Sequence, residues 1–382
     1  LNEKLFKRVL AVYEEKDSLN LTVEQKTLLE NTYDAFVKRG ANLNAADKEK
    51  YRELSKKCSL LDLQFQQNLL KSTNSYQMVV TDESKLAGLP QDIKDAAAAM
   101  AKQKGETGWM FNLSYPSYVP FMKYADNRDL RKELYVAYNT KAMVGELDNR
   151  LVLKDLVNCR LQIAKLFGFE DYASYVLQKR MAENKQNVYK LLNDLLVAYK
   201  PTAIAEVNEV QEYAKSKGAD FEIMPWDWSY YSNKLRDEKY SINDELLKPY
   251  FELEHVKKGV FGLATKLYGL QFKKNPNIPV YHSEVEAFDV LDKDGSFLAV
   301  LYTDFHPRDG KQSGAWMTEF KCQSKDANGI DHRPQISIVM NFTKPTDSTP
   351  SLLTFDELTT FLHEFGHSIH GMVANTTYES MA

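Results

Sequence analysis

The sequence predicts a mainly helical protein that carries a small β-sheet. Apolar residues recur at helical spacing through the first 220 residues, and strand-like alternation begins only after Pro276. One further amphipathic helix follows the alternating segments. Because 382 residues exceed one ordinary core, we expect a helical region over 1–220 and a region over 221–382 with helices, a small sheet and this last helix.

The composition excludes several classes of protein. The chain is 43% hydrophobic and 27% charged, which is typical of a soluble globular protein. A net charge of −4 with scattered Lys and Arg argues against a nucleic-acid partner. No run reaches the roughly 20 apolar residues of a membrane span, so no membrane partner is expected.

The cysteines bear on the compartment. There are 3 of them, far apart in sequence, which argues against a disulfide scaffold and favours a reducing compartment. We therefore expect a cytoplasmic protein. A periplasmic location stays open, because the chain begins at Leu1 and the true N-terminus is not seen.

Two long helices stand out in the first region. One is expected over 45–71 with Asn44 as its N-cap, because apolar residues follow at steps of three and four: Tyr51, Leu54, Cys58, Leu61 and Phe65. The other is expected from Asn184 toward Tyr199, where Pro201 bends or restarts it and Gly218 ends it.

Strand signals follow Pro276. The segment 280–305 alternates and contains "DKDG", which predicts a β-hairpin. Asp292 and Asp294 also resemble the start of a calcium loop, but the remaining ligands of such a loop are absent, so a turn is favoured. Two further strands are expected over 314–321 and 335–342, which gives a sheet of about four strands.

The last helix is expected to begin at Phe355. Thr354 and Glu357 form a capping box, in which each side chain accepts a backbone hydrogen bond from the other residue. The predicted buried stripe consists of six apolar residues: Phe355, Leu358, Phe361, Leu362, Phe365 and Ile369.

Within this helix the sequence reads His363-Glu364-Phe-Gly-His367. Residues four apart on a helix differ by about 40° in direction and roughly 6 Å in rise, so both imidazoles can point at one ion. Zinc binds histidine nitrogen at about 2.0–2.1 Å. Glu364 projects in a neighbouring direction, from which it can reach a metal-bound water and act as a general base.

Each histidine of this helix also has an interpretation that does not involve metal ligation. The bare pattern also arises by chance, so His363 and His367 could be ordinary residues of an amphipathic helix. The helical context and the preceding sheet favour zinc as the cofactor. For His370, one turn further along, a hydrogen-bonded or outer-shell role is favoured over ligation.

Several blocks make the chain recognisable: "PWDWSYYSNKLRD", "LKPYFELEHVKKGVFGLATKLYGLQF", "DGSFLAVLYTDFHPRDGKQSGAWM", "IVMNFTKP" and "TFDELTTFLHEFGHSIHGM". In this order they resemble the thimet oligopeptidase family of zinc metallopeptidases, and most closely its bacterial peptidyl-dipeptidase branch. The resemblance implies a clam-like helical ellipsoid with a deep channel that admits short peptides, and a monomer once complete. It also implies zinc ligation by His363 and His367 and a base role for Glu364.

The sequence departs from the family after this helix. Members supply the third zinc ligand as a glutamate on a following helix, and Glu379 comes too early to match it. The chain therefore looks like the middle of a longer protein. We expect the missing ligand helix to cover Phe361, Phe365 and Ile369, and the 382-residue chain alone to bind zinc poorly and not to hydrolyse peptides.

The sequence leaves three functions open. The leading one is zinc-dependent release of dipeptides from the C-termini of short peptides. The second is an endo-acting oligopeptidase of the same family. The third, from another class, is a metal-free peptide-binding or scaffold protein. For either enzyme, Gly314 and Ala315 are predicted to begin an edge strand that binds substrate backbone by β-augmentation.

Overall fold

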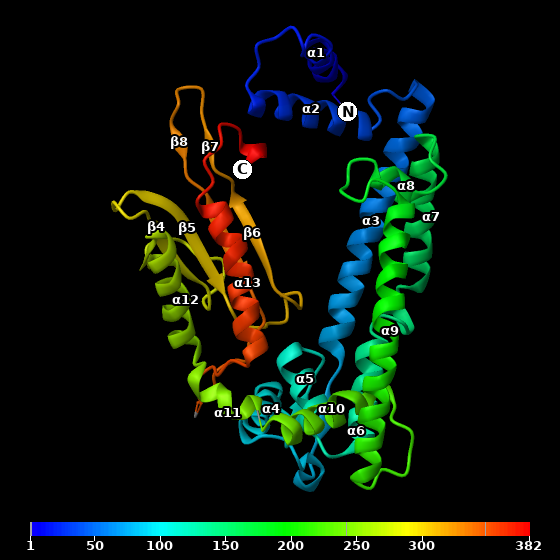
Figure 1. Cartoon of the computed structure of the whole chain (residues 1–382), viewed down its shortest axis with the longest axis vertical. Coiled ribbons are helices and arrows are strands. Elements are labelled where there is room, and N and C mark those ends of the chain that lie inside the picture. The colour runs from blue at the N-terminus through cyan, green and yellow to red at the C-terminus, as the bar shows by residue number, and fades with distance from the viewer. Residues whose placement is uncertain (1, 242, 348) are drawn as a thin grey trace. The chain divides into compact units, whose positions relative to one another are not determined.

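The computed structural model describes residues 2–241, 243–347 and 349–382. It is mainly helical with a small mixed sheet, as Figure 1 shows, so the predicted fold class is confirmed at this level. Within the described residues, no helix combines the length and the apolar character that a membrane crossing requires.

The chain divides into two compact units, and each is built from two stretches of sequence. Unit 1 comprises Leu1–Thr73 and Thr140–Glu222, and unit 2 comprises Asn74–Asn139 and Ile223–Ala382. The division of the sequence into 1–220 and 221–382 rests on secondary-structure content rather than compactness, and it stays a proposal.

Unit 1 is helical. Its principal helices are α1 (Glu3–Glu14), α2 (Val23–Lys38), α3 (Ala45–Ser75), α7 (Arg150–Leu166), α8 (Tyr172–Leu177) and α9 (Lys185–Ser216). The prediction for α3 is confirmed, and Asn44 caps it by accepting a hydrogen bond from the Asp47 N–H at 2.9 Å. Its apolar face packs against α7 in a cluster of Leu54, Cys58, Leu156, Cys159 and Ile163.

Helix α9 excludes one of the two alternatives expected at Pro201, a restart, and leaves a bend there as an expectation. Asn184 caps its start and Gly218, with φ of 91°, follows its end, as predicted. The helix does not restart at Pro201 but continues through it. Proline removes the hydrogen bond that its own N–H would make to the carbonyl four residues earlier, and its ring crowds that carbonyl. Both Pro201 and Val197 are exposed, so this carbonyl can face water.

Unit 2 contains the remaining elements. Its helices are α4 (Gln91–Lys104), α5 (Tyr115–Tyr124), α6 (Arg128–Asn139), α10 (Pro225–Tyr240), α11 (Asp244–Leu247), α12 (Leu253–Tyr268) and α13 (Phe355–Met372). Two small two-stranded sheets pair β1 (Met78–Val80) with β2 (Trp109–Phe111) and β7 (Ser324–Lys325) with β8 (Asp331–His332).

The main sheet has five strands in the order β3-β4-β5-β9-β6. They are β3 (Gln271–Lys274), β4 (Glu286–Leu291), β5 (Phe297–Asp304), β9 (Gln335–Val339) and β6 (Trp316–Lys321). Only the β5–β9 pair is parallel. The β4–β5 hairpin at "DKDG" is confirmed, whereas β3 was not predicted because four residues carry too little alternation.

Helices α12 and α13 cover one face of this sheet and share its core (Figure 1). Phe361 and Phe365 are buried there, and Leu358 and Ile369 pack against the same cluster. Phe355 and Leu362 are exposed, contrary to prediction. At about 100° per residue these two lie at the margin of the apolar arc, directed away from its centre.

Candidate metal centre

The start of α13 is fixed by its capping box. The Thr354 hydroxyl accepts from the Glu357 N–H at 3.1 Å, and the Glu357 carboxylate accepts from the Thr354 N–H at 2.8 Å. The Thr343 N–H donates to the same carboxylate at 3.0 Å. Burial raises the pKa of Glu357 despite these donors. The predicted N-terminus is confirmed, and it is anchored in the interior of unit 2.

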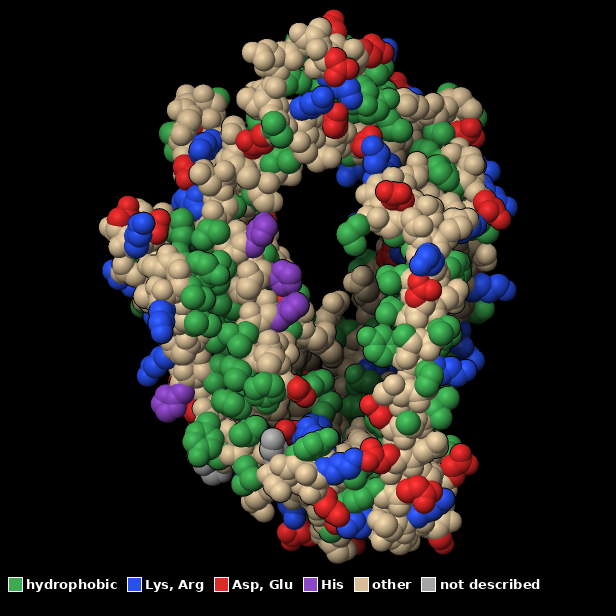
Figure 2. Space-filling view, viewed as in Figure 1, with side chains coloured by type: hydrophobic (Ala, Val, Ile, Leu, Met, Phe, Trp, Pro, Cys, Tyr) green, Lys and Arg blue, Asp and Glu red, His purple; other side chains and the backbone are tan. Residues whose placement is uncertain are grey.

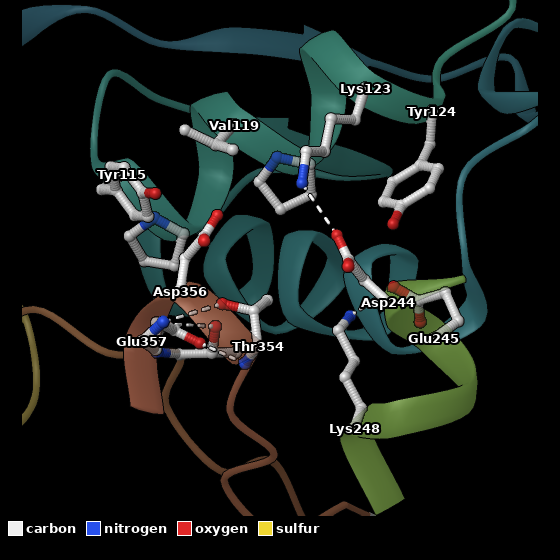
Figure 3. A pocket seen from close by; sticks show the side chains of 13 residues that line it. Tyr115, Val119, Lys123, Tyr124, Asp244, Glu245, Lys248, Thr354, Asp356 and Glu357 are labelled. Atoms are coloured by element: carbon white, nitrogen blue, oxygen red, sulfur yellow. Dashed lines mark hydrogen bonds and ion pairs between the residues drawn. The ribbon is translucent and has the colours of Figure 1, made fainter. Parts of the chain in front are cut away.

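A pocket within unit 2 borders this N-terminus, between α5, α11 and α13 (Figure 3). Both lysines of its lining are paired: Lys123 Nζ lies 2.9 Å from an Asp244 oxygen, and the buried Lys248 lies 2.9 Å from Asp92 and 2.8 Å from Glu245.

The two histidines of the motif lie on the exposed side of α13, where Figure 2 shows histidine side chains at the surface. Their Nε2 atoms are 3.3 Å apart. The ring centroids are 4.9 Å apart, and the ring planes meet at 79°. Both rings therefore direct the same nitrogen toward a common point.

This spacing can be compared with zinc chemistry. Two nitrogens bound tetrahedrally at about 2.0–2.1 Å from one zinc ion are about 3.3–3.4 Å from each other. The 3.3 Å between the two Nε2 atoms falls in this range. The residues present thus fit two of the ligands of a tetrahedral zinc site.

Glu364, between the two histidines, is buried. Its backbone carbonyl accepts from the Ser368 hydroxyl at 3.0 Å, as helix geometry allows. In the described part of the chain its carboxylate has no hydrogen bond to another residue. A carboxylate in this state is available to a water molecule.

Among the residues that the structure describes, no group of three His, Cys, Asp or Glu side chains is placed to hold a metal ion. His370 is exposed on α13, and Glu379 lies in the short turn Glu379–Met381 after it.

The expectation that the apolar face of α13 is uncovered is wrong. Phe361 and Phe365 are 0% and 3% exposed, because they pack against the sheet and α12, so they are not free to receive another helix. Phe361 lies edge-on to Phe305 with centroids 5.1 Å apart.

The end of α13 lies close to the sheet. A Cβ added at Gly371 would come within 2.7 Å of a Glu319 side-chain oxygen in β6 and 2.8 Å of the Ile336 Cδ1 in β9, so a larger residue would require these side chains to shift. Arg333 donates to the carbonyls of Met372 at 2.8 Å and Ala374 at 3.1 Å. Its Nε donates to the Leu298 carbonyl at 2.7 Å.

The predicted edge strand is displaced. It starts at Trp316, and Gly314 and Ala315 precede it. Gly314 has φ of 103°, which is not extended backbone, and the Asn341 amide donates to its carbonyl at 2.7 Å. Strand β9 likewise ends at Val339 rather than at residue 342. Within the described strands β6 is an edge, since it pairs only with β9.

Similarity to known proteins identifies the chain. The model of peptidase family M3 matches residues 121–382, and the match includes the main sheet and α13. The chain belongs to peptidase family M3. This is a family of metallopeptidases, so a metal-free scaffold is not supported.

Relatives in the M3 family are much longer. Oligopeptidase A of Salmonella typhimurium is 36% identical over 92% of this chain and 53% of its own length. Dipeptidyl carboxypeptidase of Escherichia coli is 36% identical over 100% of this chain and 56% of its own length. The chain thus spans about half the length of the curated relatives it matches. A putative oligoendopeptidase F from Bacillus anthracis matches 97% of the chain and 52% of its own, with a TM-score of 0.44 and 15% identity.

Sequence reasoning missed the polar group that holds the loop before β6. The buried Asp304 accepts two hydrogen bonds from Arg308 and one from Lys311, each at 2.8 Å. The Lys311 ammonium also donates to the carbonyls of Asp304 and His306. These residues lie in one of the blocks that suggested the family, but their spacing alone gives no signal of mutual contact.

Proposed function

We propose that the protein containing this chain hydrolyses short peptides with zinc, through His363 and His367 as ligands and Glu364 as general base. The observation that carries the proposal is the 3.3 Å between the two Nε2 atoms, with Glu364 directly after His363 in the same helix. Family membership supports a metal of this kind.

The chain's own residues account for the proton transfers. Zinc, when bound, supplies a Lewis acid that polarises the peptide carbonyl and lowers the pKa of a bound water toward about 7. Glu364 accepts a proton from the attacking water as its oxygen bonds to the carbonyl carbon. It then donates this proton to the departing amine nitrogen as the C–N bond breaks.

The edge strand supports substrate alignment. Strand β6 is an edge of the sheet, one face of which α13 covers, and Gly314 and Ala315 lead into it. We propose that a peptide backbone pairs with this edge and that the Gly314 turn keeps its approach open. The family's clam-like channel would restrict access to short, unfolded peptides.

Release of C-terminal dipeptides is the proposed specificity, and endo-cleavage is the alternative. Both names occur among relatives of equal identity, so the products must decide. A peptide with a free C-terminus and the same peptide amidated at that end should be compared by mass spectrometry. Loss of cleavage on amidation supports dipeptide release, and equal cleavage supports the oligopeptidase. A monomer in the cytoplasm is the proposed state.

Glu364→Gln in the complete gene product tests the mechanism. It should retain zinc and lower peptide cleavage by about 10²–10⁴-fold, the usual contribution of general acid–base catalysis. Asp356→Asn, an exposed carboxylate change on the same helix, is the control and should leave cleavage near the parent rate. Parent-like cleavage by Glu364→Gln would reject the assignment.

A further inference from the structure

Two of the three cysteines meet in the core of unit 1. Cys58 lies in α3 and Cys159 in α7, and they are 9% and 1% exposed. Both are free thiols. They belong to the cluster through which the two helices pack, whose other members are Leu54, Leu156 and Ile163. The fold thus brings together two thiols that are far apart in the sequence.

Hydrogen bonds place the two sulfur atoms close to each other. The Cys159 Sγ donates to the Leu54 carbonyl at 3.2 Å. Leu54 lies about one turn before Cys58, on the same face of α3. The thiols also interact directly, since the pKa of Cys58 is raised to about 12, first by burial and then by a hydrogen bond with Cys159. The sulfur of α7 therefore lies against the turn of α3 that carries the other sulfur.

Contacts at both ends of α7 fix its position along α3. Directly before α7, the Asn149 amide donates to the Phe65 carbonyl of α3 at 2.9 Å. Directly after α7, the Phe167 ring lies edge-on to the Tyr51 ring of α3, with centroids 5.6 Å apart. The two thiols lie between these contacts, so their approach is held by the packing of both helices.

The surroundings of the pair favour one thiol reaction over others. Burial among apolar side chains disfavours a charged thiolate, so neither cysteine suits a fast-reacting nucleophile. A disulfide carries no charge and is compatible with an apolar cluster. The pair should therefore oxidise slowly, when the contact opens transiently, and stay oxidised once the bond has formed.

We propose that Cys58 and Cys159 are a redox pair that forms a disulfide between α3 and α7 when the protein meets a disulfide-type oxidant. One thiolate attacks a sulfur of the oxidant R–S–S–R and displaces R–S⁻, and the other attacks the cysteine sulfur of this mixed disulfide and displaces the second R–S⁻. The two cysteines lose two protons and two electrons, and the oxidant becomes two R–SH. The inference is independent of the proposed hydrolysis.

The disulfide joins parts of the chain that local structure does not. It closes a loop of about 100 residues, which includes the stretch Asn74–Asn139 of unit 2. In a reducing compartment the pair stays as two thiols, and in an oxidising one it becomes this covalent link. The state of the pair therefore reports the compartment in which the protein resides.

Oxidised glutathione tests the proposal. The folded 382-residue chain is incubated with oxidised or reduced glutathione until the products no longer change, then unfolded at low pH, alkylated and analysed by peptide mass spectrometry. Oxidised glutathione should join the peptides of Cys58 and Cys159 to each other and leave Cys322, in unit 2, alkylated. Dithiothreitol should restore both thiols. Cys322→Ala should keep the link, and Cys159→Ala should lose it.

Three results of this experiment would overturn the proposal. They are two unlinked thiols after oxidation, glutathione bound to both cysteines without a link between them, and a link that involves Cys322 or a second chain.

Thermal unfolding tests whether the folded structure accommodates the link. Closing a loop of this length restricts the unfolded chain, so the Tm of the oxidised chain should exceed that of the reduced chain by at least about 5 °C. Cys159→Ala and Cys58→Ala cannot form the link, and each should have the same Tm in oxidised and reduced glutathione. A linked chain with an unchanged or lower Tm would overturn the proposal, because the native contact would then have to distort to form the bond.

Discussion

Helices α13 and α9 have the same kind of sequence pattern and opposite surroundings. In α13 the centre of the apolar stripe is buried, with Phe361 at 0% exposure against the sheet and α12. In α9 the apolar residue Leu196 is 58% exposed. An amphipathic pattern therefore does not by itself show whether the apolar face of a helix is buried.

The largest expected effect tests this contrast directly. Phe361→Ala in this chain should lower the free energy of unfolding by about 3–5 kcal/mol, because it leaves a cavity among packed aromatic rings. Leu196→Ala should change it by less than about 0.5 kcal/mol, as is usual for an exposed position. Urea unfolding followed by circular dichroism measures both. Similar losses of unfolding free energy for the two variants would contradict the difference in burial between α13 and α9.

A smaller effect concerns the buried ion pair at the end of β5. Asp304→Asn should cost about 3 kcal/mol at pH 7, because it leaves the buried Lys311 ammonium without its carboxylate. Asp309→Asn is the control in the same loop. Its partner Lys104 is exposed, so a loss of at most about 1 kcal/mol is expected.

The Asp304 effect should also depend on pH. Burial disfavours the charged form, but the hydrogen bonds from Arg308 and Lys311 outweigh it and hold the pKa of Asp304 below its ordinary value of 3.8. The stabilisation is then fully present above the unfolded-state pKa and is lost as pH falls through the lower folded-state pKa. The difference between parent and Asp304→Asn should shrink below about pH 4. A constant difference down to pH 2 would contradict this account.

The smallest expected effect lies at the turn into β6. Gly314→Ala should cost about 1–2 kcal/mol from backbone strain alone, since φ is 103° and a Cβ there would meet no atom within 4 Å. Gly310→Ala, at an equally open position without positive φ, should be nearly neutral. If the edge binds peptide, Gly314→Ala in the complete enzyme should raise KM with little change in kcat. An unchanged KM would argue against the edge-strand role.

Local signals allowed the sequence to predict much of this structure. The capping box at Thr354 and Glu357, the N-cap at Asn44, the helix start at Asn184 and the hairpin at "DKDG" each depend on residues close together in sequence. The motif spacing also led to the expectation of two histidine rings on one side of α13, and the 3.3 Å between their Nε2 atoms is consistent with it.

The predictions from sequence were wrong where residues distant in the sequence determine the backbone conformation or cover a side chain. The start of β6 is set by the Asn341 side chain, which holds the Gly314 carbonyl from 27 positions away. The bare surface was expected on α13 because the sheet residues that cover Phe361 cannot be recognised as its partners from spacing. The roles of His363, Glu364 and His367 stay predictions that the proposed variants test.

Arg333 has a consequence for the route of the chain beyond the histidines. One guanidinium joins the β5 residue Leu298 to the carbonyls of Met372 and Ala374 at the end of α13. These hydrogen bonds fix the direction of the backbone, as it leaves the helix, relative to the sheet. Gln323 continues this restraint, since its side chain accepts from the Thr376 N–H at 2.6 Å and donates to the Thr376 carbonyl at 3.1 Å.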